Sequence, residues 1–290
     1  MQLKHKLEAG EFVLLAEIEP PKGVDVAHML NSAGKVKEEV SAFVIPEMSN
    51  AVMRMSALGS AMMVQNKRME TIMQVSCRDR NRIALQADLL AAYACGIQNI
   101  MAVTGEDPSY GDHHQAAAVY DIDIDQLLAA IAALQTGKDM AGIELDGKPS
   151  FFVGAAANAG LSGNELDQEI EAVKRKIDAG VRFLITPPLF APETIQPFIE
   201  KLGRPDVFII PTVVLLKSLG MARYMARNMP NVHIPDDLIK RIQKAPDKAR
   251  ECTKIAAETL KALKAKGLSG ALIATIGWED KLPEIIYGIK

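Results

Sequence analysis

The sequence is poor in cysteine. It holds only 3 cysteines in 290 residues. The wide spacing of Cys77, Cys95 and Cys252 gives neither a disulfide framework nor a set of metal ligands. This usage is typical of a reducing compartment, and we expect a cytoplasmic protein.

Long apolar runs and a strong charge of either sign are also missing. No stretch approaches the roughly 20 apolar residues of a membrane-spanning helix. The first residues mix charged with apolar side chains and lack the apolar core of a signal peptide. The net charge of −3 argues against a basic surface for nucleic acid or anionic lipid. We therefore expect a soluble protein with neither nucleic acid nor a membrane as partner.

Two nucleotide-binding motifs are absent. No Gly-x-Gly-x-x-Gly segment occurs, which argues against a Rossmann dinucleotide site. The segment 104–106 (Thr-Gly-Glu) lacks the Gly-Lys-Ser/Thr ending of a Walker loop. His113 and His114 follow Asp112 in a polar stretch, where solvated histidines are favoured over a metal site.

What the sequence does contain is a regular series of short apolar runs. Most are rich in β-branched or aromatic side chains and bounded by proline or glycine, as buried parallel strands are. The eight runs are 12–19, 42–45, 71–76, 97–104, 151–157, 183–186, 207–210 and 270–277. Amphipathic helical patterns lie between several of them, at 82–93, 165–179, 235–243 and 249–266.

Strand-like runs therefore recur eight times along the chain, at intervals of roughly 25 to 60 residues, with helical patterns between several of them. This predicts an α/β protein with a single-domain (β/α)8 TIM barrel over residues 1–290. A doubly wound open sheet is the alternative. No Gly-rich linker divides the chain, and we expect 136–148 to be a loop or small hairpin before the fifth strand.

In such a barrel the functional residues lie at the carboxyl ends of the strands. The first strand ends in Glu17 and Glu19, which share one side of the strand because they are two residues apart. A carboxyl group inside the barrel would lose solvation, its pKa would rise, and it could donate a proton. Alternatively, both carboxylates lie at the solvated rim.

The third and fourth strands end in the most polar loops. Arg78 and Arg80 either bind an anion, such as a phosphate or a carboxylate, or pair with neighbouring acidic residues. Gly105 would let a ligand approach the backbone closely. The segment 174–176 is a run of three basic residues. We expect most of these side chains to lie in solvent and one of them to turn toward the barrel mouth. Trp278 either caps the barrel or contacts a ligand.

A set of segments spread over nearly the whole chain matches one family in order. The segments are 16–21, 77–81, 96–105, 119–123, 176–180, 183–186, 217–223 and 274–277. Together they resemble the methylenetetrahydrofolate reductase family, and the likeness is greatest to the short form of anaerobic one-carbon pathways. That form often works beside an iron–sulfur or zinc partner subunit.

The resemblance implies a barrel that binds a flavin in its mouth, FAD with FMN as an alternative, and that forms 5-methyltetrahydrofolate from methylenetetrahydrofolate. It implies that Glu17 is the general acid and that Glu106 lies near the flavin, where the family usually has aspartate. The electron donor would be NAD(P)H or a partner subunit. The resemblance is also compatible with a protein that forms a homo-oligomer. Besides Glu106, the expected flavin-binding residues are Ser76, Thr104, Gly105, Tyr120, Arg175 and Lys176, with Arg78 and Asn158 added as polar residues at strand ends.

The likeness is weaker on the folate side. The expected substrate positions are Glu17, Thr186 and Pro187. Family members usually have glutamine where Pro187 stands, and proline offers the pterin no side-chain hydrogen bond. Ala191 replaces an aspartate. Three functions follow: reduction of methylenetetrahydrofolate, action of a related flavoprotein on another pterin or one-carbon substrate, or a non-catalytic subunit that binds a partner through the methionine-rich segment 48–55.

Overall fold

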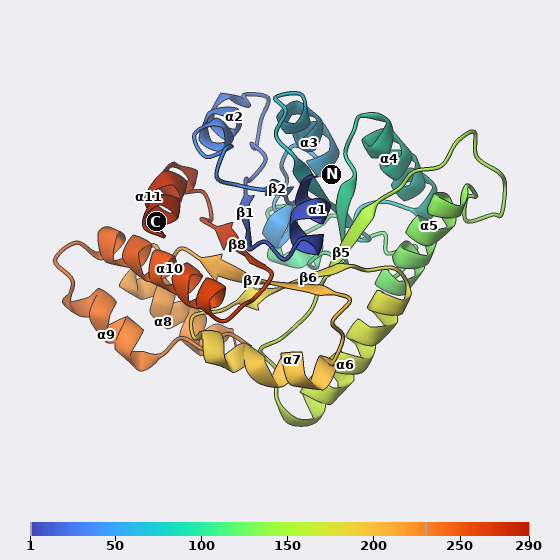
Figure 1. Ribbon diagram of the computed structural model, residues 1–290. Helices are drawn as coiled ribbons and strands as arrows, with labels where there is room; N and C mark the ends of the chain where they lie inside the picture. Colours follow the sequence, from blue (N-terminus) through green and yellow to red (C-terminus); the bar gives the residue numbers. More distant parts are fainter. Residues whose placement is uncertain (1, 230, 290) are drawn as a thin grey trace.

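Eight parallel strands close into a barrel in the computed structural model, which describes residues 2–229 and 231–289 (Figure 1). The strands follow sequence order around the barrel, and the eighth pairs with the first to close it. They are β1 Val13–Glu17, β2 Ala42–Ile45, β3 Thr71–Ser76, β4 Asn99–Val103, β5 Phe152–Ala156, β6 Phe183–Pro188, β7 Phe208–Val214 and β8 Gly270–Ala274. The predicted (β/α)8 barrel is confirmed, and the open sheet is excluded.

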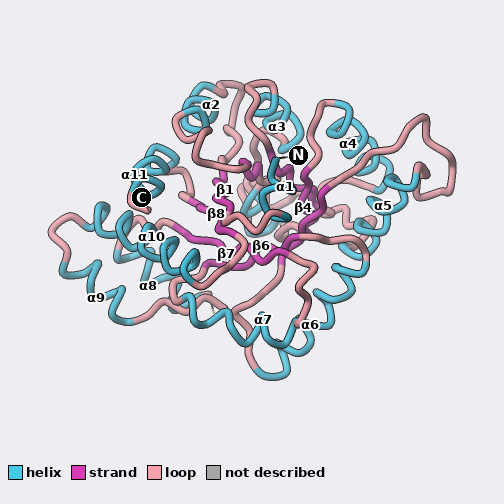
Figure 2. The backbone as a smooth tube through the Cα atoms, viewed as in Figure 1, coloured by secondary structure: helices cyan, strands magenta, loops and turns pink. Residues whose placement is uncertain are grey.

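Most of the helices form a layer around the strands, as Figure 2 shows. They are α1 Gln2–Glu8, α2 Ala27–Gly34, α3 Ala57–Gln65, α4 Arg82–Ala94, α5 Ile124–Thr136, α6 Gly163–Asp178, α7 Gln196–Leu202, α8 Leu219–Asn228, α9 Asp236–Lys244, α10 Lys248–Ala265 and α11 Leu282–Tyr287. The four helical patterns expected from the sequence correspond to α4, α6, α9 and α10. Among the described residues, no helix is long and apolar enough to cross a membrane.

The barrel interior and the space between barrel and helices are two separate apolar clusters. The larger cluster packs the outer faces of the strands against the helices. The smaller one fills the barrel, with Val13 and Leu15 of β1 among its members. Because alternate residues of a strand share a face, Glu17 continues this inward series. The sequence pattern of β1 therefore places a carboxyl group above an apolar floor.

Helix α1 closes the amino-terminal end of the barrel (Figure 1). Leu3 and Leu7 are fully or almost fully buried and belong to the interior cluster. The carboxylate of Glu70 accepts hydrogen bonds from the backbone N–H groups of Gln2, at 2.8 Å, and Leu3, at 3.3 Å. These contacts satisfy donors that a helix start leaves without intrahelical partners. This end of the barrel is thus filled by side chains, and open space is left at the other end.

Side-chain caps fix where the helices begin after the loops at the open end. Ser56 caps α3, and Asn81 caps α4. Asp123 begins α5 with a capping box, since its side chain accepts from Gln126 N while the Gln126 side chain accepts from Asp123 N. The segment 136–148 forms the small hairpin that the sequence allowed, with an antiparallel bridge between Lys138 and Glu144.

Candidate active site

A cavity of about 470 Å³ lies at the carboxyl ends of the strands, on the side formed by β1 to β5. Active sites of (β/α)8 barrels lie at this end, and the volume is in the range of small-molecule pockets. Five residues singled out from the sequence line it together: Glu17, Thr104, Gly105, Glu106 and Lys176. The other lining residues are Glu47, Ser49, Gln74, Ala102, Val103, Ile124 and Ala156.

Glu17 carries the strongest electrostatic perturbation in the cavity. Burial, together with the neighbouring carboxylates of Glu19 and Glu279, raises its pKa from 4.5 to about 7. Glu279 is itself buried on the loop after β8, with His28 Nε2 at 3.6 Å from its carboxylate. A carboxyl group with a pKa near neutrality can hold a proton and release it at physiological pH.

Glu19, two residues further on, has a different environment. Its Oε1 lies 2.9 Å from Arg54 Nε, in an ion pair that is only partly exposed. Burial raises the pKa of Glu19, but the Arg54 charge opposes that rise. Two carboxylates on one side of β1 therefore have different partners, which is how neighbouring acids acquire different roles.

The turn at Gly105 forms one wall of the cavity. Its φ is +87°, and a Cβ there would lie 2.4 Å from Ser76 Oγ and 2.8 Å from Arg78 Cβ, so only glycine fits. Ser76 Oγ lies 3.4 Å from the carbonyl oxygen of Thr104 and accepts from Arg78 N. The Tyr120 hydroxyl donates to the carbonyl oxygen of Gly105 at 3.1 Å. Ser76 and Tyr120 thus hold the turn, while Thr104 and Gly105 face the cavity.

One cation of the basic run on α6 reaches the cavity. Lys176 donates to the carbonyl oxygen of Ala156 at 2.9 Å and lines the cavity wall. Lys174 pairs instead with Glu171 on the helix surface, and Arg175 is exposed. The expectation that one of these three turns toward the barrel mouth agrees with the position of Lys176.

Three other sequence candidates lie outside this cavity. The backbone N–H of Asn158 donates to Glu169 Oε1 at 2.9 Å. Thr186 is buried, and Pro187 follows it at a small separate cavity of about 80 Å³ that His233 also lines. A substrate contact at Thr186 or Pro187 stays a prediction, because it requires a ligand that extends beyond the main cavity.

Arg78 is buried just behind the cavity wall. Its side chain is 2% exposed, and its guanidinium donates to Asp79, to the carbonyl oxygen of Glu106 and to that of Met48. The neighbouring Arg80 pairs with Glu47 at 2.9 Å. Of the two sequence interpretations, pairing within the protein describes both side chains in this structure, and a direct flavin contact by Arg78 stays a prediction.

Glu47 and Gln74 are cavity residues that the sequence reasoning missed. Glu47 is 3% exposed, and its Oε2 accepts from Ala57 N at 3.0 Å. Burial raises its pKa, and Arg80 opposes the rise. Gln74 Oε1 accepts from Glu47 N at 3.3 Å. Gln74 could have been recognised from the sequence as a candidate. It stands at an inward position of β3, between Ile72 and Ser76, where an apolar residue is the norm.

Asp112 and His113 connect loops across the rim. The Asp112 carboxylate accepts from Lys22 Nζ and from Met53 N and lies 2.9 Å from His113 Nδ1. These contacts lower the pKa of Asp112, with Lys22 contributing most. Within the described part of the chain, no three His, Cys, Asp or Glu side chains gather as metal ligands would.

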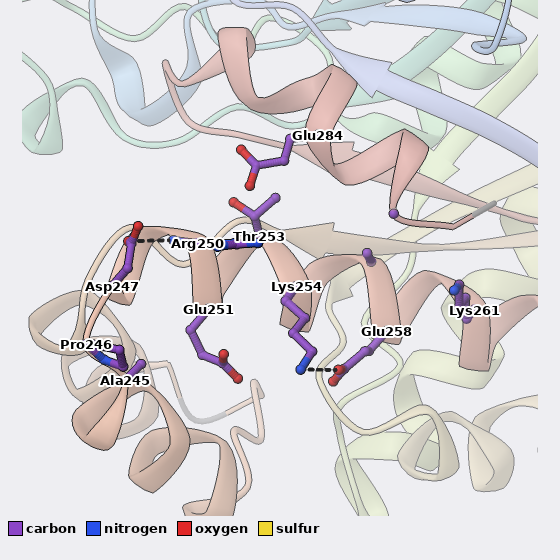
Figure 3. A pocket seen from close by; sticks show the side chains of 12 residues that line it. Ala245, Pro246, Asp247, Arg250, Glu251, Thr253, Lys254, Glu258, Lys261 and Glu284 are labelled. Carbon is purple, nitrogen blue, oxygen red and sulfur yellow. Dashed lines mark hydrogen bonds and ion pairs between the residues drawn. The ribbon is translucent and has the colours of Figure 1, made fainter.

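A larger groove of about 640 Å³ lies on the outside of the helix layer, beside α10 and the end of α11 (Figure 3). Two contacts join residues that line it: Lys254 lies 3.9 Å from Glu258, and the Asp247 side chain caps α10 by accepting from the backbone N–H of Arg250. The groove is remote from the strand ends, and nothing in it resembles a catalytic set.

The comparisons with known proteins agree with the barrel. The family model described as methylenetetrahydrofolate reductase matches residues 2–290. Among solved structures, EDTA monooxygenase (EmoA) from Chelativorans sp. BNC1 has a TM-score of 0.57 at 14% identity, covering 96% of this chain and 92% of that chain. DmoA from Hyphomicrobium sulfonivorans has a TM-score of 0.51 at 9% identity, with coverages of 95% and 86%.

A third structure, 2,3-dimethylmalate lyase of the PEP mutase/isocitrate lyase superfamily, has a TM-score of 0.52 at 12% identity, covering 93% of this chain and 78% of that chain. At such identities these likenesses show a shared fold alone. No curated protein sequence matches the chain.

Proposed function

The chain belongs to the methylenetetrahydrofolate reductase family, and from this premise we propose that it is a flavin-dependent reductase of a one-carbon carrier. The proposed reaction is the reduction of methylenetetrahydrofolate to 5-methyltetrahydrofolate. The single observation that carries the proposal is Glu17, a carboxyl group with a pKa of about 7 on the wall of the main cavity at the strand ends.

The cavity residues fit a flavin. At Gly105 the backbone itself forms the wall, since its positive φ leaves no room for a side chain. Ala102, Val103 and Ala156 give an apolar surface suited to a flat ring, and Lys176 places a cation at the edge, suited to an anionic group. When bound, the flavin supplies the hydride. FAD is the proposed form, with FMN as the alternative.

Glu17 would protonate the nitrogen that is released when the methylene bridge of the substrate opens. With a pKa of about 7, a large share of this group is protonated at neutral pH. A general acid works best when its pKa lies near the working pH. The nearby carboxylates of Glu19 and Glu279 help keep the proton on Glu17 until the substrate nitrogen accepts it.

Glu106 would provide a carboxylate beside the flavin. Its side chain is 55% exposed, and its Oε2 lies 3.7 Å from Arg78 Nη1. Its own backbone oxygen is bound by the same guanidinium at 3.2 Å. The loop that carries Glu106 is therefore held while its carboxylate stays accessible to a bound ligand.

The electrons would come from NAD(P)H or from an iron–sulfur cluster of a partner subunit. Zinc has no redox chemistry, so a zinc partner subunit would have to hold a separate electron carrier to serve as donor. NAD(P)H would have to enter the same barrel mouth as the folate substrate. A partner subunit would have to dock on the rim loops, where Met53 is 44% exposed and Tyr110 is 80% exposed.

A second candidate keeps the flavin and changes the carrier. Pro187 offers no side-chain donor, and it lies at a cavity separate from that of Glu17. A folate site that loses a pterin hydrogen bond loses about 1–3 kcal/mol where a polar ligand atom stays unpaired. Another pterin or one-carbon substrate would avoid this loss.

The visible spectrum of the purified protein, with the released flavin identified, tests the cofactor. A yellow protein that releases FAD is expected. A protein that is colourless and stays colourless when FAD or FMN is added would contradict the proposal and would favour a non-catalytic subunit.

An anaerobic assay with 5-methyltetrahydrofolate and an artificial electron acceptor tests the reaction. Turnover by the flavin-replete protein is expected, with loss of turnover in Glu17→Gln. Glu8→Gln is the matched control, because Glu8 is an exposed residue of α1 at the closed end of the barrel. Absence of turnover in a flavin-replete wild-type sample would exclude this substrate.

A further inference from the structure

Three arginines stand at every second position after β3, and each reaches a different acidic partner. Arg78 contacts Asp79, Arg80 contacts Glu47 and Asp88, and Arg82 contacts Asp121. Their burial differs sharply, with side chains that are 2%, 19% and 47% exposed. Arg78 is therefore a buried cation, and Arg82 is a surface cation of the same type in the same segment.

The guanidinium of Arg78 joins two loops that are far apart in sequence. Its Nε and Nη2 donate to the two carboxylate oxygens of Asp79, at 2.7 and 2.8 Å. Its Nη1 donates to the carbonyl oxygen of Glu106 at 3.2 Å and to that of Met48 at 3.4 Å. Asp79 thus orients the guanidinium, and the remaining nitrogen connects the loop 46–56 to the loop 104–123.

The backbone around Arg78 makes further contacts with the loop 104–123. The carbonyl oxygen of Arg78 accepts from Val119 N at 2.7 Å. Gly105 packs so closely that a Cβ there would lie 2.8 Å from Arg78 Cβ. With the bond to Glu106, Arg78 touches this loop at three separate points.

The loop 46–56 is strained where Arg78 holds it. Met48, Asn50 and Ala51 have φ values of 49°, 55° and 54°, which non-glycine residues rarely adopt. Such a conformation persists only where surrounding contacts hold it. Gly111 of the other loop supports the same segment, because a Cβ at Gly111 would lie 1.8 Å from the carbonyl oxygen of Ala51. Arg78 and Gly111 therefore both reach the strained segment 48–51 from outside. Other contacts, such as those of Arg80 with Glu47 and of Asp112 with Met53, hold the flanking residues of the loop.

We propose that Arg78 is a positioning residue that fixes the loops 46–56 and 104–123 against each other and so sets the cavity wall. It is not among the residues that line the cavity, but Ser49, Gly105 and Glu106 of these loops are. Arg78 acts on a ligand through these three residues. The effect on flavin rests on the proposed function, whereas the effect on the loops does not.

Hydrogen exchange of the ligand-free protein tests the loop contacts directly. Arg78→Met removes the donors and keeps much of the side-chain volume. A hydrogen bond to a charged group contributes about 1.5–3 kcal/mol, so exchange of amides in 46–56 and 104–123 should rise about tenfold or more. The barrel strands should exchange as in the wild type. Arg82→Met, the matched control on the surface, loses only the side-chain contacts with Asp121 at the end of the second loop. Exchange should therefore rise near Asp121 alone and stay unchanged in 46–56 and 104–118.

Flavin titration by fluorescence provides the second measurement. Arg78→Met should weaken flavin binding about tenfold or more, in proportion to the loop opening, and Arg82→Met should leave it unchanged. Arg78→Lys should recover only part of the affinity, because an ammonium group cannot reproduce the planar fork that binds Asp79 and both loops.

Each outcome is decisive. Unchanged exchange in both loops of Arg78→Met would overturn the proposal, and so would increased exchange with unchanged flavin affinity. If the wild type binds no flavin, the proposed function fails, but the exchange result still decides the loop contacts. If Arg78→Met does not fold, Asp79→Asn replaces it, since it removes the carboxylate that orients the guanidinium. Wild-type exchange in that variant would equally overturn the proposal.

Discussion

The two sides of the barrel mouth are built differently. On the side of β1 to β4, the loops bind one another through Arg78, Arg54 and Asp112, and they enclose the main cavity. On the side of β6 to β8, Pro187 lies at a small cavity, and Lys217 lies 5.4 Å from the centre of the Trp278 ring. The first side contains a buried cation, Arg78, that connects two of its loops, which would suit a cofactor that stays bound. On the second side the loop contact of Lys217 with the carbonyl oxygen of Ile276 is exposed, which would suit a substrate that comes and goes.

The largest expected effect lies at Glu17, at the end of β1, the strand of the first side that pairs with β8 of the second. Glu17→Gln should lower kcat by about 10²- to 10⁴-fold, the usual contribution of a general acid, with little change in flavin affinity. Steady-state kinetics with flavin titration measure both. Equal loss of kcat and flavin affinity would mean that Glu17 belongs to the cofactor side rather than to the chemistry.

The raised pKa of Glu17 also predicts a pH-dependent stability. The folded protein keeps this proton up to about pH 7, whereas an unfolded chain loses it near 4.5. The contribution of this group therefore lowers the free energy of unfolding as pH rises from 4.5 to 7. The loss reaches its full value, at most about 3 kcal/mol, above pH 7. Glu17→Gln should then unfold at a higher temperature than the wild type at pH 8 but not at pH 4. If the wild type and Glu17→Gln had the same melting temperature at pH 8 as well as at pH 4, the buried environment assigned to Glu17 would be contradicted.

Gly105 tests the cofactor side alone. Gly105→Ala should weaken flavin binding and lower stability by about 1–3 kcal/mol, because the turn has a φ of +87° and the new Cβ would meet Ser76 Oγ. Gly142→Ala is the matched control, since Gly142 has a φ of +84° but an added methyl group there would meet no atom within 4 Å. If both variants lowered flavin affinity equally, the cause would be the backbone strain that the two positions share and not the position of Gly105 at the cavity.

The smallest expected effect is on the substrate side. Pro187→Gln should lower KM for methylenetetrahydrofolate by about fivefold, the equivalent of one hydrogen bond of roughly 1 kcal/mol, and leave flavin affinity unchanged. Pro192→Gln, at the start of a neighbouring 3₁₀ helix, is the control. An unchanged KM in Pro187→Gln would favour another pterin or one-carbon substrate and would sharpen the contrast between the two sides.

Much of the fold was predictable, because buried parallel strands are short apolar runs whatever their tertiary partners. The end of β6 was not. The sequence placed it before Pro187, yet β6 runs to Pro188, and the register with β7 shifts between Thr186 and Pro188. Thr212 Oγ1 donates to the carbonyl oxygen of Thr186 at 2.6 Å. Proline lacks a donor but keeps its acceptor, so a strand can end in prolines where its neighbour supplies the donor.

The candidate site was only partly predictable. The alternation along the first strand puts Glu17 and Glu19 on one side and cannot tell which of them is buried as an acid. Their environments differ because of neighbours from other loops: Arg54 pairs with Glu19, and Glu279 lies near Glu17. The sequence also left open whether Arg78 binds an anion, because its acceptors include carbonyl oxygens, which no residue type reveals. A side chain that binds backbone atoms of distant loops therefore produces no recognisable motif in the sequence, because any residue type can supply those atoms.

The contact between Gly111 and Ala51 has a consequence for how such sequences diverge. A side chain at position 111 would overlap the backbone of the segment 49–51. A substitution in one loop is therefore tolerated only with a changed path of the other, so the two positions should vary together among relatives. A relative with a larger residue at the position of Gly111 is expected to carry an insertion, a deletion or a different turn at the position of Ala51.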